Sequence, residues 1–218
     1  MNAKKLLTPL LIFVFLIAPG AFGSLSDFSH VPLRRRLQHA EEFYLLYREN
    51  MYRGTENLNA NIFWLQHALE YPFAPPVQAL AKIESPRHWK KYKQLFRMHM
   101  HHLITENYLR LGERYEKNHI FFFNQQFKKE ILEGLQITKI YYQRAQHYWD
   151  KVKSQADALW EDRDTELTAI DGEVEKWQDL VYKIHFNHIE VNYPKQIKKR
   201  LQEVEKKLSM VQKGEYEQ

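Results

Sequence analysis

Cysteine is absent from the 218 residues of this chain. Its absence excludes disulfide bonds, thiol catalysis and thiolate metal sites, and it also excludes lipid attachment to an N-terminal cysteine. Glycine and proline are scarce as well, at 7 and 8 residues, whereas 44% of the residues are hydrophobic. Few turn-forming residues and ample apolar side chains are typical of long helices joined by few connections. The composition therefore favours an all-α fold.

The common motifs of catalytic and phosphate-binding sites are also missing. The sequence contains no glycine-rich phosphate loop, no Gly-x-Ser-x-Gly elbow and no His-Glu-x-x-His pattern. The formal net charge is +5, and it falls to +3 if Lys4 and Lys5 are removed with a signal peptide. Such an excess is too small to predict nucleic-acid binding. We expect a protein that is not an enzyme, requires no cofactor and does not bind nucleic acid.

The N-terminal residues have the three parts of a secretory signal peptide. Two lysines precede an apolar run over residues 6–18, and Ala21 and Gly23 supply the small residues of a cleavage site. We expect residues 1–23 to be removed after Gly23, so that the mature chain begins at Ser24 in the periplasm. An uncleaved signal would instead anchor the chain in the membrane, although the run is shorter than the about 20 residues of a comfortable span.

Apolar residues that recur at alternating steps of three and four predict a series of amphipathic helices. The expected helices cover residues 33–53, 57–71, 86–117, 127–159, 173–190 and 197–211, with a short helix at 77–83. Ser85 and Pro86 mark the start of the third helix, because serine caps a helix and proline suits its first position. The third and fourth helices are unusually long, and we expect them to pack antiparallel and form the core.

A polar run at residues 161–166 is the expected boundary within the mature chain. Residues 24–160 would form a domain of helical hairpins, and residues 161–218 would form a C-terminal coiled-coil extension. An apolar stripe of heptad spacing runs through that extension. It consists of Ile197, Leu201, Val204, Leu208 and Val211. The stripe either docks on helix 173–190 as an antiparallel hairpin or pairs with another chain, by self-association or with a partner, so these are the expected partner-binding residues.

One cluster contains candidate metal ligands. His99 and His102 lie three residues apart on the third helix, and Glu106 follows one turn later. Imidazole nitrogens suit zinc, copper or nickel. However, the cluster lies among core positions and the sequence identifies no second pair of ligands, so structural or surface histidines are the favoured interpretation.

Two segments resemble the helices of a tetratricopeptide unit. The first helix is similar over an aromatic-x-x-Leu-Gly-x-x-Tyr pattern, and the second over a Thr-x-x-x-Tyr-x-x-Ala pattern. The matching residues are Tyr108, Leu111, Gly112, Tyr115, Thr138, Tyr142 and Ala145. The resemblance implies antiparallel helical hairpins, with a longer insert between the two helices than the family has. Gly112 would then let the second helix approach closely.

Residues 79–149 also resemble, in overall pattern, tetratricopeptide-like exported proteins of spirochaetes, including components of the periplasmic flagellar collar. The similarity lies in Trp-x-x-Tyr-x-x-Leu-Phe-x-Met-His at 89–99 and Phe-Phe-Asn at 122–124. It implies a scaffold around the periplasmic flagellar motor, with motor components as partners and no catalysis.

Two functional hypotheses follow from these observations. The first is an exported periplasmic helical scaffold that binds other proteins, because helical-repeat surfaces bind peptides or helices in concave grooves. The second is a periplasmic ligand- or metal-binding accessory protein that serves a transporter. Recovery of motor proteins in a pull-down would favour the first hypothesis, and a bound metal or small molecule would favour the second.

Overall fold

The computed structural model describes residues 36–52, 57–116, 127–170 and 172–214. The chain divides into two units, Met1–Pro32 and Leu33–Gln218, and all described residues belong to the second. The predicted signal peptide and its cleavage site therefore lie outside the described residues. Among the described helices, none combines the length and the apolarity that a membrane span requires.

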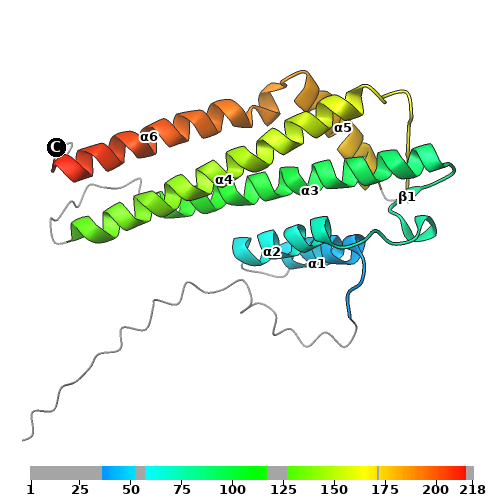
Figure 1. The fold of residues 1–218 in the computed structure, drawn as a ribbon, viewed down its shortest axis with the longest axis horizontal. Coiled ribbons are helices and arrows are strands. Elements are labelled where there is room, and N and C mark those ends of the chain that lie inside the picture. The colour runs from blue at the N-terminus through cyan, green and yellow to red at the C-terminus, as the bar shows by residue number, and fades with distance from the viewer. Residues whose placement is uncertain (1–35, 53–56, 117–126, 171, 215–218) are drawn as a thin grey trace, which may run out of the picture. The chain divides into compact units, whose positions relative to one another are not determined.

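Helices make up nearly all of the regular structure in the described ranges (Figure 1), which confirms the all-α prediction. They are α1 (Ala40–Tyr52), α2 (Leu58–Glu70), α3 (Pro86–Tyr115), α4 (Lys128–Trp160), α5 (Glu173–His185) and α6 (Tyr193–Lys213). Short 3-10 helices cover Pro76–Gln78 and Ile189–Val191. Two strands of two residues, β1 (Ala81–Lys82) and β2 (Thr168–Ala169), pair antiparallel.

The helix starts follow from local capping. The Asn57 side chain accepts a hydrogen bond from the Ala60 N–H at the start of α2, and Ser85 Oγ accepts one from the His88 N–H at the start of α3. Helix α1 begins at Ala40, later than predicted. The Glu42 carboxylate accepts hydrogen bonds from the backbone N–H groups of Gln38 and His39, which precede the helix, and so caps its start. The predicted helix at 77–83 does not form, since this segment contains a 3-10 turn followed by strand β1.

The antiparallel pair α3 and α4 forms the centre of the described fold. Helix α2 packs on both α1 and α3, and α5 packs mainly on α4 and also on α3. The two long helices share a continuous core in which Leu95, Met98, Leu135 and Val152 are fully buried. From Leu135 to Leu159 the stripe predicted over residues 127–159 therefore faces the core in α4, as the spacing of three and four requires, whereas Phe127 at its start is exposed.

The predicted C-terminal coiled-coil hairpin is wrong. Helix α6 packs along α4 rather than on α5, and Figure 1 shows α6 beside the N-terminal part of α4. The reason is length: α5 has 13 residues and ends at His185, whereas α4 has 33 and offers a longer surface. The 3-10 turn Ile189–Val191 separates α5 from α6, and α6 then runs antiparallel to α4.

This docking also corrects the predicted partner-binding residues. Ile197, Val204 and Val211 are buried, and Leu201 and Leu208 are partly buried against the same core. An apolar stripe that already covers α4 of its own chain is not an open surface for a second chain. The five residues are therefore part of the core.

The predicted boundary at residues 161–166 is corrected as well, because Leu33–Gln218 forms one compact unit. The polar run is a turn that is bonded to α3. Arg87 Nε donates to Asp162 Oδ1 at 3.1 Å, and the buried Lys91 ammonium donates to the Asp162 carbonyl at 2.7 Å. Thr165 donates to the same carboxylate at 2.8 Å. The polar residues serve this turn and do not mark a linker.

Candidate binding groove

Gly112 lies where α3 and α4 approach closely. A Cβ atom at this position would lie 2.7 Å from Cδ1 and 2.8 Å from Cζ of Tyr142. The other residues of the tetratricopeptide-like pattern differ in burial. Tyr108, Leu111, Thr138 and Ala145 are buried with Tyr142, whereas Tyr115 is 40% exposed.

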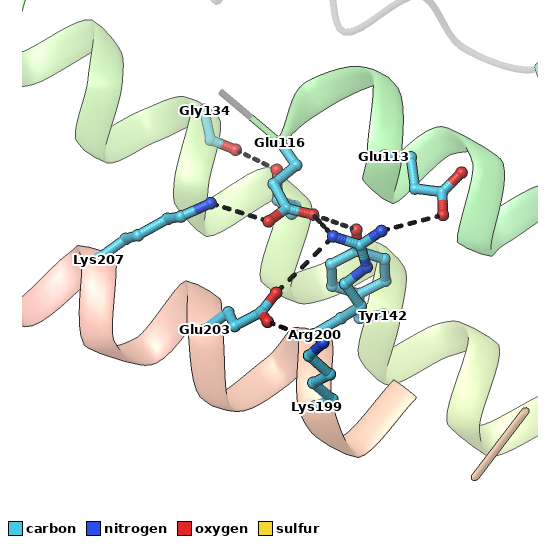
Figure 2. Close-up of polar contacts among 9 residues, drawn as sticks. Glu113, Glu116, Gly134, Tyr142, Lys199, Arg200, Glu203 and Lys207 are labelled. Atoms are coloured by element: carbon cyan, nitrogen blue, oxygen red, sulfur yellow. Dashed lines mark hydrogen bonds and ion pairs between the residues drawn. The ribbon is translucent and has the colours of Figure 1, made fainter. Parts of the chain in front are cut away.

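The same helix crossing contains a buried carboxylate. Glu116 follows α3 and accepts hydrogen bonds from Tyr142 Oη at 2.7 Å and Lys207 Nζ at 2.9 Å (Figure 2). Arg200 Nη1 lies 3.4 Å from the same carboxylate and its Nη2 lies 3.6 Å from Glu113. Burial alone would raise the pKa of Glu116, but the bonds from Tyr142 and Lys207 outweigh it and hold the pKa below its ordinary value. This cluster joins the end of α3 to both α4 and α6.

A cavity of about 460 Å³ opens on the side of α3 that faces α1, α5 and the start of α6. Its floor is a face of α3 from His99 to Glu113, and we call this cavity the α3 groove. Charged residues of both signs line it. They are Arg48, Glu106, Arg110, Glu113, Glu173 and Lys176.

Two tyrosine–carboxylate hydrogen bonds join the walls of the α3 groove. Tyr44 of α1 donates to Glu173 Oε2 of α5 at 2.8 Å. Tyr193 of α6 donates to Glu106 Oε1 of α3 at 2.7 Å. Burial first, and then the neighbouring carboxylate, raises the pKa of each phenol well above its ordinary value. Both tyrosines therefore stay protonated and remain donors, so α1 is bonded to α5 and α6 is bonded to α3.

Glu173 is also the centre of an ion-pair cluster. Lys176 Nζ lies 3.2 Å from Glu173 Oε1, and Arg48 Nη2 lies 3.7 Å from the same oxygen. The carboxylate is thus surrounded by donors from α1 and α5. Because Glu173 is in the first turn of α5, its charge is also favourable for the helix dipole.

The three candidate metal ligands, His99, His102 and Glu106, all lie on α3. His99 packs on Trp177, with 5.1 Å between ring centroids, and His102 Nδ1 lies 3.9 Å from Glu106 Oε2. No group of three His, Cys, Asp or Glu side chains that could hold a metal ion occurs in the described part of the chain. His99 and Glu106 lie on the floor of the α3 groove.

The sequence interpretation singled out His99, His102 and Glu106 but missed Tyr44, Glu173 and Tyr193. Tyr44 and Glu173 are 129 residues apart in the sequence, so no local spacing connects them. The available signal was indirect: Tyr44 lies on a predicted apolar stripe, and such a position does not reveal where its hydroxyl group points.

Taken as a whole, the groove presents donors, acceptors and aromatic faces to a ligand. These features suit non-covalent recognition of a polar or mixed-charge molecule. No curated protein and no solved structure matches the chain. The model of one family, described as a domain of unknown function (DUF8513), matches residues 87–214. This match contains α3 to α6 and leaves the α1 wall of the groove outside. Because the match spans more than half of the sequence, the chain belongs to the DUF8513 family.

Proposed function

We propose that this protein is an exported helical scaffold that binds a polypeptide segment of another protein in the α3 groove. The observation that carries the proposal is the mixed-charge cavity between α1, α3 and α5. Three features of recognition meet there: a concave shape, aromatic side chains, and charged groups contributed by separate helices.

The order of helix packing supports a hairpin-repeat scaffold. Helix α2 packs on α1 and on α3, and α4 packs on α3 and on α5. Helices α2 and α4 thus each contact their own partner and the first helix of the next pair, as in stacked helical-hairpin repeats, whereas α6 packs on α4 and not on α5. In such an arrangement the first helices line the concave surface, and α1, α3 and α5 line the groove together with Tyr193 and Gln196 at the start of α6.

The dimensions of the groove fit a short segment. From His99 to Glu113 the α3 floor spans 14 residue steps, which is roughly 21 Å at the rise of an α-helix. An extended chain covers that length with about six residues. Alternating charges along the floor and rim would fix the register of a segment that carries charges of both signs.

The cellular setting of the proposal comes from the sequence. The signal-peptide pattern of residues 1–23 supports a periplasmic location for the mature protein, where its partners would be other periplasmic proteins. The resemblance of residues 79–149 to spirochaete flagellar-collar proteins makes components of the flagellar motor the first partners to test.

The test is cross-linking and co-purification from cells with two charge reversals in the groove, Arg110→Glu and Lys176→Glu. A matched control reverses Lys90 and Lys198, which do not line the groove. We expect the control to recover the same partners as the wild type and the groove variant to lose them, with unchanged far-ultraviolet circular dichroism. Recovery of all partners by the folded groove variant would contradict the proposal.

The size of the cavity also favours a second candidate function. A volume of about 460 Å³ lies within the range of small-molecule sites. The protein would then be a periplasmic ligand-binding accessory protein, for example one that serves a transporter. Native mass spectrometry of protein purified from its own periplasm separates the two: a bound small molecule that Lys176→Glu releases supports this function, and an empty chain that captures proteins supports the scaffold.

A further inference from the structure

His99 is connected to the wall bond between α1 and α5. The Tyr44 hydroxyl group donates its hydrogen to Glu173, so its oxygen must accept in the 3.4 Å contact with His99 Nε2. His99 therefore carries its hydrogen on Nε2, and its buried Nδ1, which has no hydrogen-bond partner, is a bare lone pair. A hydrogen-bonded chain thus runs from α3 through α1 to α5.

His102 stands beside the second wall bond. Tyr193 donates to one oxygen of Glu106, and His102 Nδ1 lies 3.9 Å from the other oxygen. Neither ring nitrogen of His102 has a hydrogen-bond partner, and the residue is only 8% exposed. The His99 and His102 rings stack at 6.4 Å between centroids. The two histidines therefore form one pair that connects both wall bonds.

The surroundings of His99 oppose a positive charge on its ring. Trp177 stacks on it from α5, and Tyr44 is at its Nε2 edge. Arg48 of α1 and Lys176 of α5 are neighbouring cations, and the carboxylate of Glu173 pairs with both. Burial, then His102, then these two cations lower the pKa of His99 well below its ordinary value.

His102 faces a different set of groups. Trp149 of α4 and Tyr193 of α6 pack against its ring, and Glu106 is the neighbouring carboxylate on α3. Burial lowers the pKa of His102, and the attraction of Glu106 opposes this only in part. A protonated His102 would draw Glu106 toward itself and so compete with Tyr193 for the carboxylate.

We propose that His99 and His102 make the α3 groove acid-sensitive: proton uptake by this pair breaks the two tyrosine–carboxylate bonds, which separates α1 from α5 and the start of α6 from α3. The pair is neutral when the groove is closed and gains solvent and protons when it opens. The groove therefore opens as the pH falls below the ordinary histidine range. On the proposed function, which this last step assumes, acid also releases the bound segment.

The size of the effect follows from proton linkage. Below about pH 6.5 the histidines bind protons in the open state but not in the closed state. The equilibrium constant for opening therefore rises by up to about tenfold for each histidine as the pH falls by one unit. For the pair this gives up to about a hundredfold per pH unit.

Hydrogen exchange on the mature chain, without any partner, tests the opening. Protection factors of α1 amides are measured from pH 7.5 to pH 5.0 and compared with those of α6 amides near Val204, which lie in the core. We expect α1 protection to fall steeply below pH 6.5 in the wild type. The double variant His99→Gln, His102→Gln should keep it, and the exposed control His188→Gln should behave like the wild type.

Protection of α1 that is unchanged down to pH 5.0, or lost equally in the double variant, would overturn the proposal. If the double variant fails to fold, nitrogen-15 spectra of the wild-type histidines decide. His99 must be neutral with its hydrogen on Nε2 at pH 7. A charged ring or a hydrogen on Nδ1 would refute the hydrogen-bonded chain from His99 through Tyr44 to Glu173. Because no partner is present, these results do not depend on the scaffold proposal, whose own failure would show only in the capture experiment.

Discussion

Replacing Gly112 by alanine should destabilise the fold, although alanine is the better helix former. The new Cβ would lie 2.7 Å from Cδ1 of Tyr142, a distance that requires one of the two helices or the ring to shift. The ring has little freedom, because Tyr142 is fully buried and its hydroxyl group donates to Glu116 at 2.7 Å. Movement of the ring would therefore also weaken the bond to the buried carboxylate.

The expected magnitude is the difference of opposing effects. Alanine gains about 1 kcal/mol over glycine within a helix. Overpacking costs about 1–3 kcal/mol, and a weakened hydrogen bond to a charged group costs up to about 1.5–3 kcal/mol. We expect a net loss of about 1–3 kcal/mol in the free energy of unfolding, and a larger loss for Gly112→Leu. For a domain of this size the melting temperature would fall by roughly 2–12 °C.

Urea and thermal unfolding, followed by circular dichroism, measure this loss. The matched control is Gly134→Ala on α4, where a Cβ would meet no atom within 4 Å. That variant should gain about 0.5–1 kcal/mol, because only the propensity term applies. A Gly112→Ala protein as stable as the wild type, or more stable, would refute the close crossing of α3 and α4 at this point.

Three further predictions concern other parts of the chain. Glu116→Gln should lower the free energy of unfolding by about 1–3 kcal/mol at pH 7. Because the pKa of Glu116 in the folded state lies below its ordinary value, the stabilisation by its carboxylate is complete above about pH 4.5 and is lost as the pH falls further. The unfolding curves of variant and wild type should therefore converge in acid. The double variant Leu201→Asp, Leu208→Asp should lower the free energy of unfolding by about 2–4 kcal/mol, because both side chains pack against the core and buried carboxylates would separate α6 from α4; urea unfolding with unchanged stability would contradict this docking. N-terminal sequencing of the protein from cells should begin at Ser24, and a start at Met1 would mean that the apolar segment is retained.

Local sequence determined which segments are helical. Ser85 and Pro86 start α3 as predicted, since capping and the fixed proline backbone depend only on neighbouring residues. The stripe over residues 127–159 likewise identified α4 and its buried face, because helix periodicity is a property of one segment. The failed prediction of a helix at 77–83 has a non-local cause. Strand β1 forms by pairing with β2, in which Ala81 pairs with Ala169, 88 residues away, and Lys82 with Thr168, 86 residues away, so the local pattern does not predict it.

The candidate site was less predictable than the helices. The sequence located His99, His102 and Glu106 on one helix face, and the structure places these three at the α3 groove or directly beside it. The hydrogen bonds of His99 and Glu106 at the groove involve residues on other helices. Tyr44 lies in the predicted helix 33–53, and Tyr193 lies between the predicted helices 173–190 and 197–211. Only the packing of α1 and α6 brings their hydroxyl groups to the two carboxylates.

The tertiary structure also decided where the C-terminal stripe goes. An amphipathic helix such as α6 must bury its apolar face, but its own residues do not specify the surface that covers it. The 13-residue α5 was the nearest candidate in sequence, and the 33-residue α4 is the surface that α6 uses. Periodicity fixes the buried face of a helix, whereas the choice of partner depends on the lengths and positions of all helices at once, and for that reason the groove, its wall bonds and the docking of α6 exist only in the assembled fold.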